Sequence, residues 1–181
     1  MRELSLNIMD VAQNSVSAGA SLIEIDLAEQ TADSLLTITI TDNGRGMTED
    51  ELGRVTDPFY TTRTTRDVGL GVPFFKMSSE MTGGSFSIKS APGVGTTVTA
   101  RYRTDHIDMT TVGDMNETVL LLIFGNPHLD FLYNRTRDGG GFALDTRQLR
   151  EVLGEDVPLN NNDVAAWIRE YLAEQEAENM P

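Results

Sequence analysis

The sequence has 181 residues, of which 39% are hydrophobic and 23% charged, so its composition is that of a folded domain and not of a fibrous or disordered chain. The formal net charge of −14 argues against nucleic-acid binding, because contacts to phosphates need clustered Lys and Arg. The absence of cysteine excludes disulfides, thiolate zinc sites and cysteine nucleophiles. No apolar run has the length of a signal peptide or a bilayer span, so we expect a cytoplasmic protein that does not bind membranes.

The charge is distributed unevenly along the chain. Residues 1–103 carry nine basic and thirteen acidic side chains, whereas residues 104–181 carry five and fifteen. Residues 104–117 are polar and show no regular hydrophobic pattern. We therefore predict a domain over residues 1–103, a linker over 104–117 and a C-terminal α+β extension over 118–181 whose role the sequence leaves open.

Hydrophobic periodicity gives the elements of the first part. Leu4, Ile8 and Val11 recur at helical spacing, while apolar residues alternate with polar ones in the segments read as strands. In chain order the predicted elements are a helix over 3–18, strands over 22–27 and 36–41, a short helix over 49–53, a loop over 56–71, a helix over 72–82 with Pro73 in its first turn, and strands over 85–89 and 96–102.

The second part reads as a strand over 118–124, a hairpin that turns at residues 138–141, and helices over 146–153 and 163–177. Asn162 is the predicted N-cap of the last helix. Trp167 and Tyr171 fall on an apolar stripe of that helix, which is more typical of a core or a dimer contact than of a ligand site, so a homodimer stays open.

Polar residues in the first helix suggest chemistry. Asp10 and Asn14 are four residues apart and share one face. A carboxylate can orient or deprotonate an attacking group, and an amide oxygen can ligate a hard cation such as Mg²⁺. An amphipathic helix with a solvated face explains the same spacing.

Glycine-rich segments follow or precede several of the predicted elements. Asp42 ends a strand and is followed by Gly44 and Gly46, which allow the backbone to approach a ligand closely. Glycines at 69 and 71 precede a helix, where backbone amides attract anions, and a further glycine precedes Thr96. Each segment, taken alone, is also compatible with an ordinary turn.

Taken together and in order, these segments resemble the GHKL, or Bergerat-fold, ATP-binding superfamily. IMDVAQNSVSAGA resembles its N box, TDNGRGM and GLG its two glycine boxes, DPFYTTR its F box and GVGTT its last glycine box. The resemblance covers residues 1–103. It implies an α+β fold, a two-layer α/β sandwich in which helices cover one face of a mixed β-sheet, with ATP and Mg²⁺ as cofactors.

The resemblance also assigns roles to individual residues. Asn14 would ligate the Mg²⁺ that bridges the ATP phosphates, and Asp10 would orient or activate the attacking group. Asp42 would bind the adenine amino group with help from Thr96 and an ordered water. Gly44, Gly46 and Met47 belong to the box that passes close to the base.

Further residues are assigned to the segment that follows. Phe59 would stand at the start of the ATP lid, and Gly69, Leu70 and Gly71 would present backbone amides to the phosphates. Arg63 or Arg66 would reach the phosphates from the lid, but the sequence does not choose between them. An ordinary solvent-exposed position in the loop explains either arginine equally well.

The resemblance favours a histidine-kinase-like module that lacks a phosphoacceptor domain of its own. His106 and His128, the two histidines of the chain, both follow the ATP module and lie outside any helical hairpin pattern. We therefore expect transfer of phosphate from ATP to a separate regulatory or phosphoacceptor protein. Asp10 stands where Glu is common in hydrolytic members, which counts against hydrolysis. A non-catalytic ATP sensor and a gyrase- or mismatch-repair-type clamp are the alternatives.

Overall fold

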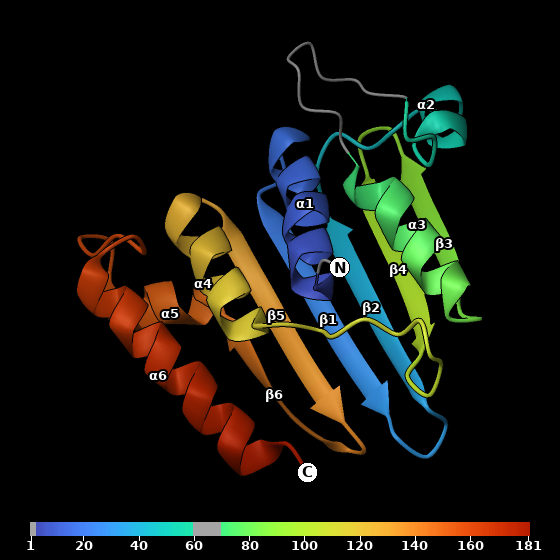
Figure 1. The fold of residues 1–181 in the computed structure, drawn as a ribbon. Coiled ribbons are helices and arrows are strands. Elements are labelled where there is room, and N and C mark those ends of the chain that lie inside the picture. The colour runs from blue at the N-terminus through green and yellow to red at the C-terminus, as the bar shows by residue number, and fades with distance from the viewer. Residues whose placement is uncertain (1–2, 60–69) are drawn as a thin grey trace.

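A computed structural model describes residues 3–59 and 70–181, and within them the strands form one six-stranded sheet in the order β3-β4-β2-β1-β5-β6 (Figure 1). Neighbouring strands are antiparallel except β1 and β5, which are parallel. The strands are β1 (Leu22–Gln30), β2 (Leu35–Asp42), β3 (Ser85–Ala91), β4 (Gly95–Arg103), β5 (Asp130–Arg137) and β6 (Gly140–Asp145). The helices are α1 (Leu4–Ser17), α2 (Glu49–Arg54), α3 (Gly71–Met81), α4 (Met115–Gly125), α5 (Thr146–Leu153) and α6 (Asn162–Asn179).

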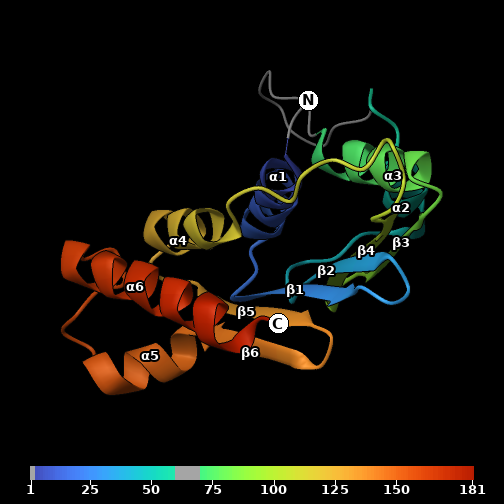
Figure 2. The same cartoon turned by 60° about the horizontal axis from the view of Figure 1, so that its bottom comes forward.

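The alternation in the strands sorts the two faces of the sheet. In β1 and β2 every second residue is an almost fully buried aliphatic, and the residues between them are mostly charged or threonine. Figure 2 shows α1, α3 and α4 over one face of the sheet. The buried aliphatics of β1 and β2 belong to the same hydrophobic core as the buried residues of these helices. The predicted α+β fold, with a mixed sheet covered by helices on one face, is confirmed.

The predicted strand over 118–124 is wrong, because this segment lies within helix α4. Asp114 caps the helix by accepting a hydrogen bond from the backbone amide of Glu117, at 2.9 Å. Five of the six buried residues of α4 recur at the spacing of one helical face, and Leu120 is the sixth: Met115, Thr118, Val119, Leu122 and Ile123. The run of apolar residues hides this period, since Leu121 and Phe124 are exposed members of the same run.

The predicted hairpin and the last two helices are present, with two corrections. The turn consists of Asp138 and Gly139 alone, both with positive φ, as in the two-residue turns that match strand twist. Gly140 begins strand β6. The N-cap of α6 is Asn161 and not Asn162, because the Asn161 side chain accepts from the amide two residues on.

The C-terminal part shares its core with the first part. Strand β5 pairs with β1 over eight registered positions, from Leu22↔Asp130 to Glu29↔Arg137. The backbone amides of Leu4 and Ser5, at the start of α1, donate to the carbonyls of Thr111 and Val112, at 3.0 and 2.7 Å. The proposed boundaries at 103 and 117 therefore separate segments that lie in one continuous sheet.

Candidate functional site

A cavity opens between α1, the ends of β2 and β4, the loop after β2 and the start of α3. Five of the residues predicted from sequence line it, and they come from three separate stretches of the chain: Asn14, Asp42, Gly46, Met47 and Thr96. Aliphatic side chains complete the walls: Val11, Ile40, Val55, Val72, Ile88 and Val98. The cavity is thus an apolar slot with polar groups at particular places, which is the usual construction of a small-molecule site.

The Asp42 carboxylate is fixed in the cavity by two neighbours. Ser15, which is almost fully buried, donates its hydroxyl to Asp42 Oδ2 at 2.6 Å, and the Gly44 amide donates to Oδ1 at 2.8 Å. An ionised carboxylate has about four acceptor positions, so two hydrogen bonds orient Asp42 and leave it able to accept from a ligand. The arrangement suits an acceptor aimed at an exocyclic amine.

Ser90 joins three parts of the rim. Its hydroxyl accepts from the Met47 amide at 2.8 Å, donates to the Gly95 carbonyl at 2.9 Å and contacts Thr96 Oγ1 at 2.8 Å. Because a serine hydroxyl has one proton, Thr96 is the donor in the last contact and keeps its own acceptor lone pairs. Thr96 pairs in register with Asp42 on the neighbouring strand, so both residues face the same end of the cavity.

The glycines of the loop after β2 are required by packing within the protein. Gly46 has φ +69°, and a Cβ placed there would lie 1.9 Å from the Ala91 carbonyl oxygen. At Gly44 a Cβ would come within 2.9 Å of the Ala18 side chain. The loop is therefore pressed between the end of α1 and the turn after β3, which explains the glycines without any ligand.

The start of α3 lies against the middle of α1. A Cβ on Gly71 would be 2.9 Å from the Asp10 Cβ, so Asp10 stands beside the first turn of α3. Leu70 occupies the N-cap position of α3, and its side chain makes no capping hydrogen bond. Asp10 is exposed and does not line the cavity, whereas Asn14, one turn along α1, does.

The remaining predictions concern Phe59 and the segment that follows it. Phe59 is described and is 92% exposed, and it does not line the cavity. Arg63, Arg66 and Gly69 lie outside the described residues. The roles given to all of these residues stay predictions.

Two residues that support the site, Ser15 and Ser90, were not predicted from the sequence. Ser15 falls on the apolar stripe of α1, and a small polar residue at a buried position is the signal that points to it. Ser90 lies at an ordinary position in an exposed strand, where nothing in the sequence distinguishes it.

At the rim of the cavity Arg45 pairs with Glu51 at 3.2 Å, and the pKa of Glu51 is lowered by the Thr48 backbone amide and further by Arg45.

Comparisons with known proteins bear on the same half of the chain. A family model described as "Histidine kinase-, DNA gyrase B-, and HSP90-like ATPase" matches residues 1–106. The chain belongs to this family. The ATPase match includes every predicted site residue, and it stops three residues after β4 ends.

Relatives of the chain include a kinase. The chain is 30% identical to Sporulation kinase B of Bacillus subtilis over 58% of its own length and 24% of that protein. It is 27% identical to the Non-motile and phage-resistance protein of Caulobacter vibrioides over 63% of its own length and 14% of that protein. The chain therefore spans less than a quarter of the length of these relatives.

A solved structure shares the fold over a larger part of the chain. The N-terminal domain of a DNA repair protein matches 80% of this chain and 52% of its own chain, with a TM-score of 0.55 and 15% identity. At this identity the match shows the fold alone. It covers more of the chain than the family model does, so part of the C-terminal segment also follows a known arrangement.

The residues of the cavity fit a nucleotide with its metal. The apolar walls suit a planar base, the fixed Asp42 carboxylate suits an amino group, and Asn14 offers one hard oxygen. Among residues 3–59 and 70–181 no three acidic or histidine side chains gather to hold a metal without help. Within the same residues no helix combines the length and apolar character needed to cross a bilayer.

Proposed function

We propose that the cavity binds Mg²⁺-ATP and that this chain transfers the γ-phosphate to a separate protein. The observation that carries the proposal is the Asp42 carboxylate, held by Ser15 and Gly44 at the end of an apolar slot. Membership of the ATPase family and the resemblance to sensor kinases support it.

The base would lie between the aliphatic walls, with its amino group donating to Asp42. Thr96 would accept from a water that also contacts the base, because its own proton is donated to Ser90. The phosphates would then extend toward the first turn of α3, where the Gly71 and Val72 amides and the helix dipole would attract an anion. Asn14 would supply an oxygen to the metal, and Mg²⁺ bound there offsets phosphate charge.

Asp10 would act on the attacking group. It stands beside the start of α3, where the phosphates would end. In the transfer, the acceptor oxygen or nitrogen of the partner forms a bond to the γ-phosphorus, the bond to the bridging oxygen breaks, and ADP leaves. Asp10 would accept the proton that the attacking group loses, which is the role of a general base.

A separate acceptor is favoured by the positions of the two histidines. His106 follows β4 and His128 precedes β5, both are exposed, and neither lies on a helix. The alternative is an ATP sensor without transfer. It is favoured by the hydrogen bonds that join the start of α1 to residues 111 and 112, because they connect the cavity helix directly to the C-terminal segment.

The test uses γ-labelled ATP with Mg²⁺ in the presence of an extract of the source cells. We expect label on another polypeptide with the wild-type chain, and a loss of transfer by about 100-fold or more in Asp10→Asn, as for removal of a general base. The control, Asp33→Asn, changes an exposed carboxylate far from the cavity.

The two candidates give different results with the Asp10 variant. The chain is a sensor if two results are obtained together. No polypeptide takes the label, and ATP changes the behaviour of a partner in the same way with wild type and with Asp10→Asn. Release of free phosphate alone would contradict both the transfer and the sensor reading.

A further inference from the structure

An apolar groove lies between α5, α6 and the end of β6, on the side of the molecule away from the nucleotide cavity (Figure 1). Its walls include Leu149, Val152, Val157, Trp167 and Tyr171. Val152 is 85% exposed and Trp167 is 47% exposed, although both are apolar. Nothing in the proposed nucleotide chemistry uses these residues.

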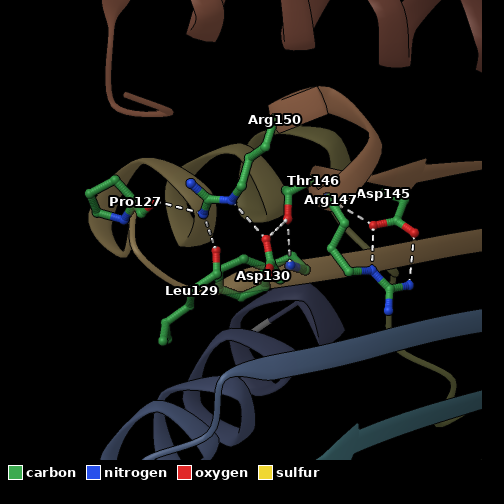
Figure 3. Close-up of polar contacts among 8 residues, drawn as sticks. Pro127, Leu129, Asp130, Asp145, Thr146, Arg147 and Arg150 are labelled. Atoms are coloured by element: carbon green, nitrogen blue, oxygen red, sulfur yellow. Dashed lines mark hydrogen bonds and ion pairs between the residues drawn. The ribbon is translucent and has the colours of Figure 1, made fainter. Parts of the chain in front are cut away.

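The α5 wall is held firmly in place by Arg150. Its guanidinium donates to Asp130 at 2.8 Å, and to the carbonyls of Pro127 and Leu129 at 2.7 and 2.8 Å (Figure 3). Thr146 adds a hydrogen bond to Asp130 at 3.0 Å. These contacts fix α5 against the start of β5, so the groove is a built feature of the fold.

The α6 wall is formed by stacked aromatic rings. Trp167 and Tyr171 have ring centroids 5.1 Å apart and lie 12° from parallel. The Tyr171 hydroxyl donates to the Ala143 carbonyl of β6 at 2.9 Å. Because this edge carbonyl already has a partner, the groove is poorly suited to pairing with an added strand and better suited to receiving side chains.

Acidic residues flank the aromatic pair. Asp163, Glu170 and Glu174 share a helical face with Trp167, from which they are four, three and seven residues away. Within the described part of the chain none of the three forms an ion pair. Arg147 and Arg169 do not neutralise these three acids, because they pair with Asp145 and Glu117, at 2.8 and 3.2 Å.

We propose that this groove binds a basic amphipathic helix of a partner protein. The apolar side chains of that helix would enter between α5 and α6, and its Lys or Arg side chains would pair with the unpaired acids. A second copy of this chain is the less suitable occupant, because each copy carries a net charge of −14. The proposal does not rest on nucleotide binding, and its test is carried out without nucleotide.

Trp167 is the one tryptophan of the chain, so its fluorescence reports on the groove directly. The probe is a synthetic helix of Leu and Lys about 14 residues long, or about four turns, without tryptophan. We expect a saturable blue shift of Trp167 emission that weakens as salt is added. The same peptide with Glu in place of Lys should give no shift.

Two variants locate the binding. Val152→Lys places a positive charge, the same sign as that of the peptide, at an exposed position in the groove. It should weaken binding of the Lys peptide about tenfold or more. Val94→Lys makes the same change at a valine that is 71% exposed on the turn between β3 and β4, and should leave the affinity unchanged. Val152→Lys should not unfold the chain, because Val152 is already exposed.

Three results would overturn the proposal. They are no emission change with the Lys peptide, equal binding of the Glu peptide, and equal weakening by Val152→Lys and Val94→Lys. A concentration-dependent dimer in sedimentation that Val152→Lys dissociates would show instead that a second copy fills the groove.

Discussion

The nucleotide cavity and the C-terminal groove are both partly apolar, but their polar groups are organised in opposite ways. In the cavity the polar side chains have fixed partners: Asp42 accepts two hydrogen bonds and Ser90 takes part in three. In the groove the apolar wall is fixed, while the acids beside it are unpaired and Val152 lies open to solvent. A preorganised polar group suits a small ligand, whereas an apolar floor flanked by charges without ion-pair partners suits a macromolecule.

The largest expected effect tests how tightly the cavity loop is packed. Gly46→Ala should destabilise the fold by about 2–5 kcal/mol, from the left-handed φ and from the collision with the Ala91 carbonyl. Urea unfolding gives the value. Gly19→Ala is the matched control, because Gly19 has φ +73° and nothing within 4 Å of a Cβ, so it should cost about 1–2 kcal/mol. Equal costs would show that the loop is not packed as described.

The next effect separates the two regions. Arg150→Ala removes one ion pair and two hydrogen bonds to carbonyls, and should cost about 2–3 kcal/mol. We expect it to abolish peptide binding in the groove and leave ATP affinity unchanged. Arg169→Ala removes an exposed pair with Glu117 and should cost about 1 kcal/mol or less. Loss of ATP affinity in Arg150→Ala would contradict the independence of the two sites.

A smaller effect sharpens the account of the cavity. Ser15→Ala removes the hydroxyl that orients Asp42, and a hydrogen bond to a charged group is worth about 1.5 kcal/mol or more, so ATP should bind about tenfold more weakly. Ser5→Ala, on the same helix, removes a buried hydroxyl that contacts Glu3 at 3.5 Å and does not line the cavity, so it should have little effect on ATP affinity. Calorimetric titration with Mg²⁺-ATP distinguishes them, and equal affinities for the two variants would remove Ser15 from the site.

The smallest effect concerns the rim of the cavity and depends on pH. The Glu51 carboxylate accepts from the Thr48 amide and from Arg45, and its folded pKa lies below the ordinary value of 4.5. Its contribution to stability is therefore present above the unfolded pKa and lost as the pH falls through the folded pKa. Glu51→Gln should be slightly less stable than wild type at pH 7, with the difference vanishing in acid. A difference that persists at low pH would contradict this cause.

The sequence predicts the cavity better than the groove because the cavity depends on short segments with local signals. A strand that ends in Asp42, a glycine turn and a helix start can each be read within a few residues. Ser15 and Ser90 were missed because their roles depend on partners 27 and 43 positions away, Asp42 and Met47. No local pattern carries that information.

In the C-terminal part, local sequence signals were sufficient to predict one element and misleading for another. The hairpin was predicted from Asp138 and the three glycines after it, which lie between two apolar stretches and set a local backbone conformation. Helix α4 was mistaken for a strand because its apolar residues run together, and only packing against α1 and α6 shows which of them face inward. The groove between α5 and α6 follows from Arg150 reaching across about twenty residues to Asp130, which the sequence does not reveal.

Calorimetry of ATP binding at millimolar Mg²⁺, on wild type, Asp42→Ala and Asp33→Ala, shows whether the cavity binds the nucleotide through Asp42. We expect saturable heat with wild type, the same affinity with Asp33→Ala, and an affinity at least about tenfold weaker with Asp42→Ala, since a hydrogen bond to a charged group is lost. No heat with the folded wild-type protein, or an affinity that Asp42→Ala leaves unchanged, would contradict nucleotide binding through Asp42.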